Sequence, residues 1–298
     1  MSLFDGDPII DPFGTFPGTG INHIKVSPDG GRLLAAGSNG NQGIGALFST
    51  DGDALGSFGD QLAPVFTANY SSDGSRIATA AYDGTVAQWT ADGIPIRKQA
   101  FEKAALCDAE YLSNGRLLVA SDNGSTSLWS QRGRELSNYN SVGTTRAVTT
   151  APNGQRVASA SDSGLIHLFN SEGKHIRSFN TGGARINSLR FSENNKRLLI
   201  STYNGFAKVF TLKGVEKLAI KATDNGITNQ ATYQPGSNHI ATAGADGFVK
   251  LWSGGGELLS SIAMPGSSSG IGAQSIAFMP NGEQLFVAMT DRSLWELS

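Results

Sequence analysis

The chain has 298 residues, with 23 lysines and arginines against 25 aspartates and glutamates. This mixed, near-neutral charge leaves no basic footprint for nucleic acid and no polybasic run for a membrane surface. The N-terminus lacks a basic segment followed by an apolar run, and no stretch approaches the ~20 apolar residues of a membrane span, so we expect a cytoplasmic protein. The 38 glycines, with few long helix-forming runs, favour an all-β sandwich, barrel or propeller.

A hairpin unit recurs along the chain and is clearest at residues 70–93. An Asp-Gly turn at 73–74 precedes the alternating run 76–80, and a second at 83–84 precedes the run that ends at Trp89. Asp-Gly between β-prone runs is the strongest short-range hairpin signal, because both turn positions need positive φ. One hairpin cannot bury its own apolar surface, so the unit needs neighbouring copies.

Seven copies of this unit follow one another, each with an aromatic residue at the end of its third run. These residues are spaced 40 to 43 apart, and all four tryptophans of the chain are among them. They are Phe48, Trp89, Trp129, Phe169, Phe210, Trp252 and Trp295. Four short strands, a to d, in about 40 residues are typical of a propeller blade. We therefore predict a single all-β domain, a seven-bladed β-propeller of four-stranded antiparallel blades. The predicted blades span about 21–58, 65–101, 106–139, 145–179, 186–220, 227–263 and 273–298.

The two ends of the chain predict how the ring closes. The last copy stops at Ser298, where its strand c finishes, and the segment from Asp5 to Phe13 is similar to the strand d segment from Asp51 to Phe58. We therefore expect residues 1–13 to supply strand d of blade seven. A closed ring has no unpaired edge inside it, so we also expect a monomer.

The repeated pattern SPDGxxLxxxxxDGxxxLWxxxG resembles the WD-repeat family, and segments 151–173 and 239–256 look like its bacterial repeats. The resemblance spans almost the whole chain. It implies a non-catalytic scaffold for protein–protein interaction, such as a sensing or adaptor module with a protein partner of unknown identity. Many repeats of the family carry a Trp–Ser/Thr–His–Asp hydrogen-bond network. Thr79, Ser159 and Thr242 match its hydroxyl position, but the histidine is missing, so we expect no blade to complete the network.

Candidate chemistry in the sequence is sparse. The segment 266–270 matches the G-x-S-x-G nucleophile elbow, but that motif needs a strand before it and a helix after it, so we interpret it as a loop. Strand a lines the channel of a propeller, and its acidic or imidazole residues are only His23, Asp108 and Glu110, on two non-adjacent blades. Such spacing makes a poor metal cage, so we expect no metal and no cofactor. Cys107 has no basic residue near it in sequence and is interpreted as a buried, inert thiol.

Irregular loops predict where a partner binds. Strand alternation places the d–a and b–c loops on one face. That face carries the long b–c loop 37–45, the Ser/Gly-rich loop 266–272 and the loop 15–20, all near the ring closure and the turn 291–292. Loops on a rigid scaffold commonly carry function, and an aromatic residue beside an arginine is a typical interface anchor. The hypothesis is a protein-binding patch of Phe16, Asn39, Gln42, Ser268 and Arg292, with Tyr82 and Tyr203 as secondary candidates.

Three alternatives remain open at this point. The loops near the closure are also explained if slack accumulates there and Phe16 plugs the seam. A small-molecule or glycan-binding propeller is favoured if aromatic and Asn/Asp side chains converge at the channel mouth. A hydrolase is favoured only if a bound metal or a Ser–His contact appears.

Overall fold

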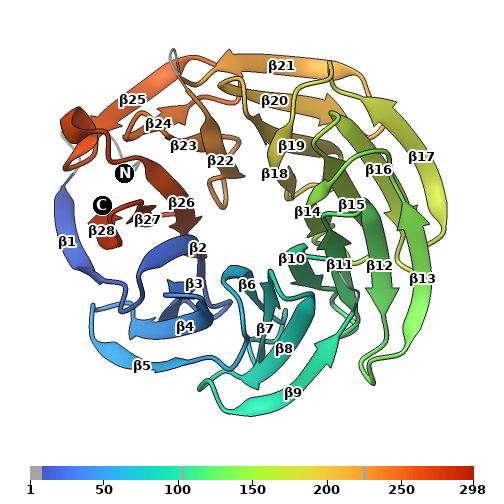
Figure 1. Cartoon of the computed structure of the whole chain (residues 1–298). Coiled ribbons are helices and arrows are strands. Elements are labelled where there is room, and N and C mark those ends of the chain that lie inside the picture. The colour runs from blue at the N-terminus through green and yellow to red at the C-terminus, as the bar shows by residue number, and fades with distance from the viewer. Residues whose placement is uncertain (1–8, 102–103, 224–225) are drawn as a thin grey trace.

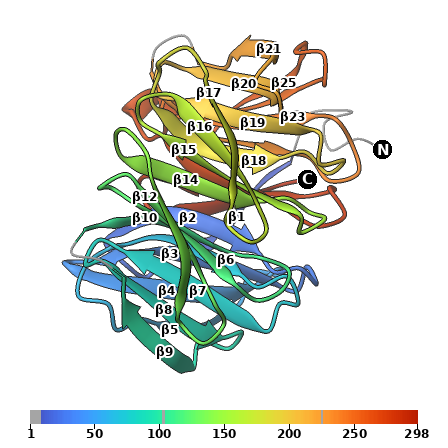
Figure 2. The same ribbon diagram turned by 90° about the vertical axis from the view of Figure 1, so that its right-hand side faces the viewer.

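A computed structural model describes residues 9–101, 104–223 and 226–298 of the chain. Seven four-stranded antiparallel sheets stand around a central channel (Figure 1), and the view turned by 90° shows them as stacked, twisted layers (Figure 2). Within each blade, strand a faces the channel and strand d forms the outer rim. The predicted seven-bladed propeller is confirmed.

The strands of the first four blades follow the chain in the order a, b, c, d. Their bounds are β2 (Gly20–Val26), β3 (Arg32–Asn39), β4 (Gln42–Ser49) and β5 (Ala54–Phe58); β6 (Val65–Tyr70), β7 (Arg76–Ala81), β8 (Thr85–Thr90) and β9 (Pro95–Ala100); β10 (Leu106–Tyr111), β11 (Leu117–Ser121), β12 (Ser125–Trp129) and β13 (Glu135–Asn140); β14 (Thr145–Thr150), β15 (Arg156–Ser161), β16 (Leu165–Asn170) and β17 (His175–Asn180).

The remaining blades repeat this order, except that the last takes its strand d from the start of the chain. Their bounds are β18 (Ile186–Phe191), β19 (Arg197–Thr202), β20 (Phe206–Thr211) and β21 (Glu216–Lys221); β22 (Thr228–Tyr233), β23 (Ile240–Gly244), β24 (Phe248–Trp252) and β25 (Leu258–Ala263); β26 (Ala273–Phe278), β27 (Leu285–Met289), β28 (Ser293–Leu297) and β1 (Ile10–Thr15). A 3-10 turn, η1 (Ser267–Ser269), lies between blades six and seven.

The ring closes through β1, as the sequence predicts. This strand pairs antiparallel with β28, from Ile10 opposite Leu297 to Thr15 opposite Ser293. The structure places the closing strand at 10–15, whereas residues 1–8 of the predicted segment lie outside the described residues. Phe13 on this strand packs edge-on against Phe286, with ring centroids 4.8 Å apart. Closure is therefore both a hydrogen-bonded strand pair and a buried aromatic contact.

Apolar clusters between neighbouring blades hold the ring together. In one of them, Leu34 and Leu47 of blade one pack against Val65, Ile77 and Trp89 of blade two. The aromatic residues that end strand c belong to these clusters or pack against them. Burial of such large rings supplies much of the stabilisation between stacked sheets.

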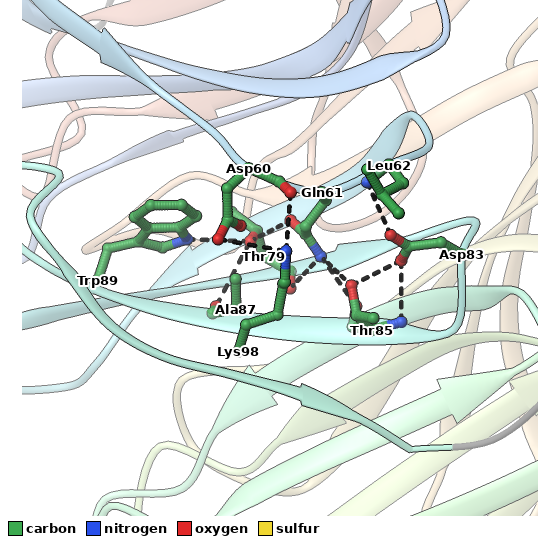
Figure 3. Close-up of polar contacts among 9 residues, drawn as sticks. All are labelled: Asp60, Gln61, Leu62, Thr79, Asp83, Thr85, Ala87, Trp89 and Lys98. Atoms are coloured by element: carbon green, nitrogen blue, oxygen red, sulfur yellow. Dashed lines mark hydrogen bonds and ion pairs between the residues drawn. The ribbon is translucent and has the colours of Figure 1, made fainter.

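A buried hydrogen-bond network in blade two corrects one expectation from the sequence. The indole Nε1 of Trp89 donates to Thr79 Oγ1 (3.0 Å), and that hydroxyl donates to Oε1 of Gln61 (2.6 Å). The Gln61 Nε2 donates to Thr85 Oγ1 (3.0 Å), and Thr85 Oγ1 donates to Asp83 (2.6 Å), as Figure 3 shows. We expected no blade to complete this network without the histidine. Gln61, which is 1% exposed, does so because its amide also offers both a donor and an acceptor.

Replacing Gln61 by leucine is expected to destabilise the protein by about 1–3 kcal/mol. The reason is that Thr79 and Thr85 would each lose a buried partner. Gln61→His, which restores a side chain with a donor and an acceptor, should recover part of this loss. Urea unfolding monitored by Trp fluorescence measures both variants. Equal stability of wild type and Gln61→Leu would show that the network contributes nothing.

Candidate functional site

A bulge in every strand a turns one residue per blade toward the mouth of the channel. In blade one, Ile21 pairs with Gly37 and His23 with Ala36, so Asn22 between them has no opposite residue. A bulge of this kind re-aims the unpaired side chain. The equivalent residues are Asn22, Phe66, Cys107, Arg146, Asn187, Asn229 and Gln274. All seven line one cavity of about 240 Å³ at the d–a and b–c end of the channel.

The next residue of strand a forms a belt of hydrogen bonds around the channel. At most junctions its side chain accepts a bond from the backbone amide of the following blade; for example, Asp108 Oδ2 accepts from Val148 N at 3.0 Å, and Ser188 Oγ from Ala231 N at 3.1 Å. At the first junction, His23 Nδ1 bonds the carbonyl of Ala68 instead (3.1 Å). In the other links a side-chain oxygen again accepts from a backbone amide of the following blade: Thr67 from Ala109, Gln230 from Ile276 and Ser275 from Ile24. Six of the seven junctions are joined in this way.

The belt is open between blades four and five. The residue at the belt position of blade four is Ala147, whose methyl group accepts no hydrogen bond. Within the described part of the chain, no side-chain hydrogen bond joins β14 to β18. Among the described residues, this junction is therefore the one on the ring that no side chain of the belt joins by a hydrogen bond.

Charged side chains lie below the mouth, on strands a of blades one, three and five. Desolvation in the channel lowers the pKa of Lys25 and raises the pKa values of Asp108 and Glu110, and the Arg190 guanidinium acts against the rise in both acids. Burial, together with the positive charges of Arg190 and Lys25, lowers the pKa of His23 to about 3. The imidazole is therefore neutral at pH 7, and two cations face two carboxyl groups in the channel.

The mouth itself carries excess positive charge. Three arginines line the cavity, namely Arg146, Arg185 and Arg190, whereas Asp108 is the one acidic side chain among its described lining residues. Arg146 forms no ion pair with any described residue, and its Nε is buried without a hydrogen-bond partner. Arg185 lies over the ring of Tyr203, with its Cζ 5.2 Å from the ring centroid.

The sequence hypothesis missed the cations of strand a. Its search of the channel strands considered acidic and imidazole residues alone. A signal was present, because Lys25 and Arg190 stand at equivalent places of their copies. The bulge that turns Arg146 into the mouth, however, is not visible in the sequence of a single copy.

The structure corrects the role expected of Phe16. The ring is 0% exposed and belongs to the apolar cluster between blades seven and one, and the Phe16 amide donates to Arg292 O at 2.9 Å. It therefore fills the seam, as the alternative explanation had it, and its ring offers no exposed surface to a partner. The predicted long loop 37–45 is also wrong. Strand β3 continues to Asn39 and β4 begins at Gln42, so only a two-residue turn separates them.

The rest of the predicted patch lies on exposed loops that contact one another. Asn39, Gln42, Ser268 and Arg292 are all exposed. Arg292 Nη1 donates to Gly18 O at 3.1 Å, and Thr19 Oγ1 accepts from Gly40 N at 2.8 Å, so these loops form a continuous row. Gly272 N donates to Thr290 Oγ1 (3.0 Å), which joins the loop of Ser268 to the same row. None of the four patch residues lines the channel cavity.

Both secondary candidates lie closer to the mouth. Tyr203, which is 50% exposed, lines the cavity. Tyr82, which is 56% exposed, packs on Phe66, itself a lining residue, with ring centroids 5.1 Å apart. The mouth therefore combines exposed aromatic rings with three arginine side chains.

A Ser–His contact occurs, but on the rim. His167 Nε2 lies 2.7 Å from Ser141 Oγ, and its Nδ1 lies 2.6 Å from Ser178 Oγ. A serine triad needs an acidic group to orient the imidazole, whereas a hydroxyl stands there in this case. Burial, followed by the charge of His175, lowers the pKa of His167 to about 4, which makes it a weak base at neutral pH. The contact is a part-buried polar link between blades three and four.

The remaining candidates for a nucleophile or a metal site also lack the surroundings that such chemistry needs. Ser268 lies on the turn η1, with no strand-to-helix elbow around it. Burial raises the pKa of Cys107 to about 12 despite nearby Arg146, so the thiol stays protonated. Among residues 9–101, 104–223 and 226–298, no three His, Cys, Asp or Glu side chains are placed to hold a metal ion.

Seven like blades closed by the first strand, two of them with a Trp-to-Thr hydrogen bond inside the blade, define a repeat-built β-propeller. The family model "WD domain, G-beta repeat" matches residues 48–90 and 216–253. An uncharacterized WD repeat-containing protein of Synechocystis sp. is 32% identical over 277 residues, which are 92% of this chain and 80% of the relative. The chain belongs to the WD-repeat family. No helix in the described residues is long and apolar enough to cross a membrane.

Proposed function

We propose that this protein is a non-catalytic scaffold, a sensing or adaptor module that binds a protein partner on the face of the d–a and b–c loops. The observation that carries the proposal is a set of four exposed large apolar side chains on that face. They come from four different loops and are Leu62 (75% exposed), Tyr82 (56%), Val142 (74%) and Tyr203 (50%). Membership of the WD-repeat family supports the same function.

The scaffold suits this role for a physical reason. Tyrosine rings bury a large area on binding while losing few rotatable bonds, and such anchors dominate interface energies. Tyr82 is held against Phe66, and Tyr203 lies beneath the Arg185 guanidinium. Because both rings are already positioned, a partner would not have to order them on binding.

The test is crosslinking capture from the source organism with Tyr82→Ala/Tyr203→Ala against wild type. A matched control exists in the same two blades, since Ile94 and Val215 are 61% and 52% exposed on the c–d turns of the opposite face. We expect the tyrosine variant to lose the captured partner and Ile94→Ala/Val215→Ala to keep it. Retention by the tyrosine variant, or loss in the control alone, would contradict the proposed face.

Binding of a small molecule is the second candidate function. The specific observation in its favour is that Asn22, Asn187 and Asn229 converge with Phe66 and Tyr203 at the channel mouth. Three of these side chains are already anchored; for example, Asn229 Nδ2 donates to Ala273 O at 2.8 Å. The cavity is therefore preformed rather than induced, as ligand sites usually are.

A further inference from the structure

The open junction lacks the hydrogen-bond acceptor that a carboxylate supplies one blade earlier. Leu189 on β18 stands where Val148 stands on β14, and Ala147 stands where Asp108 stands one blade earlier. In the closed junction, Asp108 Oδ2 accepts the hydrogen bond of Val148 N at 3.0 Å. In the open junction, the residue equivalent to Asp108 is Ala147, whose methyl group cannot accept a hydrogen bond from the Leu189 amide. An acceptor brought from outside would therefore occupy the place that a carboxylate fills in the neighbouring blade.

Positive charge is concentrated at the same junction. Arg146 precedes Ala147 on β14, and Arg190 follows Leu189 on β18, with its Nη1 donating to Leu189 O at 2.9 Å. The Arg146 Nε is buried and has no partner. Arg146 as a whole is half-buried, and a carboxylate is the group whose geometry matches the fork of its guanidinium.

We propose that the channel mouth binds a carboxylate group between blades four and five. One carboxylate oxygen accepts from the Leu189 amide and the other from Arg146, and Arg185 at the rim attracts the incoming charge. Phe66 and Tyr203 line the same cavity, so aromatic rings are available at the mouth to the carbon chain that bears the carboxylate. The inference deepens the proposed function by naming the ligand chemistry, and it rests on that function where the carboxylate belongs to an Asp or Glu side chain of a partner.

The first measurement is calorimetric titration of the whole chain with N-acetyl-L-glutamate, glutarate and inorganic phosphate. In parallel, a peptide array compares segments containing Asp or Glu with the same segments containing Asn or Gln. We expect carboxylate-dependent binding in at least one arm. Binding of the free acids alone would identify a small carboxylate ligand, and binding of acidic peptides alone a protein segment. Binding of phosphate alone, or no carboxylate-dependent binding in either arm, would overturn the inference.

Variants locate the binding at the junction. Arg146→Gln should weaken it about 10-fold to 100-fold, since a hydrogen bond to a charged group is lost. The matched control is Arg156→Gln, an exposed arginine at the other end of blade four, which should leave binding unchanged. Equal affinity of wild type and Arg146→Gln would exclude this site.

The complementary test introduces a hydrogen-bond acceptor at position 147, so that the chain's own side chain closes the belt. Ala147→Asp places an acceptor where Asp108 has one, and it should remove carboxylate binding without lowering the melting temperature. Ala147→Ser supplies a neutral acceptor and should weaken binding partly, which keeps the test decisive if the Asp variant fails to fold. Unchanged binding in Ala147→Ser and Ala147→Asp would refute the site. Continued partner capture by these variants would leave the scaffold function standing.

Discussion

Removal of residues 1–15 is expected to destabilise the whole ring by about 5 kcal/mol or more, because it takes away an entire strand and the buried Phe13 ring. Blade seven would keep only β26, β27 and β28. The outer edge of β28, paired with β1 from Ile10 to Thr15, would face solvent. The Phe13 contacts with Phe48 and Phe286 would be lost together.

Calorimetry and size-exclusion chromatography measure this effect. We expect a lower melting temperature and self-association, since an unpaired strand edge is a template for another chain. A synthetic peptide of residues 9–15 should restore part of the stability when added in excess, because it can re-form the strand pair. An unchanged melting temperature of the truncated chain would refute closure by β1.

Phe16→Ala is expected to lower the free energy of unfolding by about 3–5 kcal/mol, the usual cost of deleting a fully buried aromatic ring. Phe16 is among the largest side chains with no exposed surface and packs with Ile21, Phe48 and Phe286. The tightly packed neighbours of Phe16 cannot easily move in to fill the cavity that the deleted ring would leave. A Cβ at Gly18 would lie 2.5 Å from the Phe16 ring, so the loop is already in tight contact with it.

Urea denaturation separates this effect from one on binding. Phe16→Leu, which keeps most of the volume, should lose less stability than Phe16→Ala. Phe66→Ala serves as the aromatic control, because Phe66 is only half-buried at the channel mouth and should cost less. If Phe16→Ala matched wild type in unfolding free energy but lost partner capture, the ring would be a contact residue after all.

The repeat architecture follows from local signals that the sequence carries by itself. Asp-Gly turns, alternating runs and the period of the terminal aromatic residues are short-range features, because a hairpin is decided by its own turn. The similarity of the first segment to a strand d was also readable. Together these features predict seven blades and their closure without any knowledge of distant contacts.

Single side chains were harder to assign, since their roles depend on partners far along the chain. Gln61 replaces an imidazole in a network with Thr79 and Thr85, residues about 20 positions away. Phe16 looked like an exposed anchor because its neighbours are polar, yet the blade that covers it is built from the other end of the chain. Local composition indicates a loop but does not show what packs on it.

The sequence by itself therefore determined the number, order and closure of the blades, because these rest on turn chemistry and strand periodicity. The tertiary structure alone decided the site. The bulge in each strand a brings Arg146 and the six equivalent residues to one mouth, although they are spaced across the whole chain. The open belt at Ala147 emerges only when all seven junctions surround one channel, because a missing link is defined by the links that the other blades form.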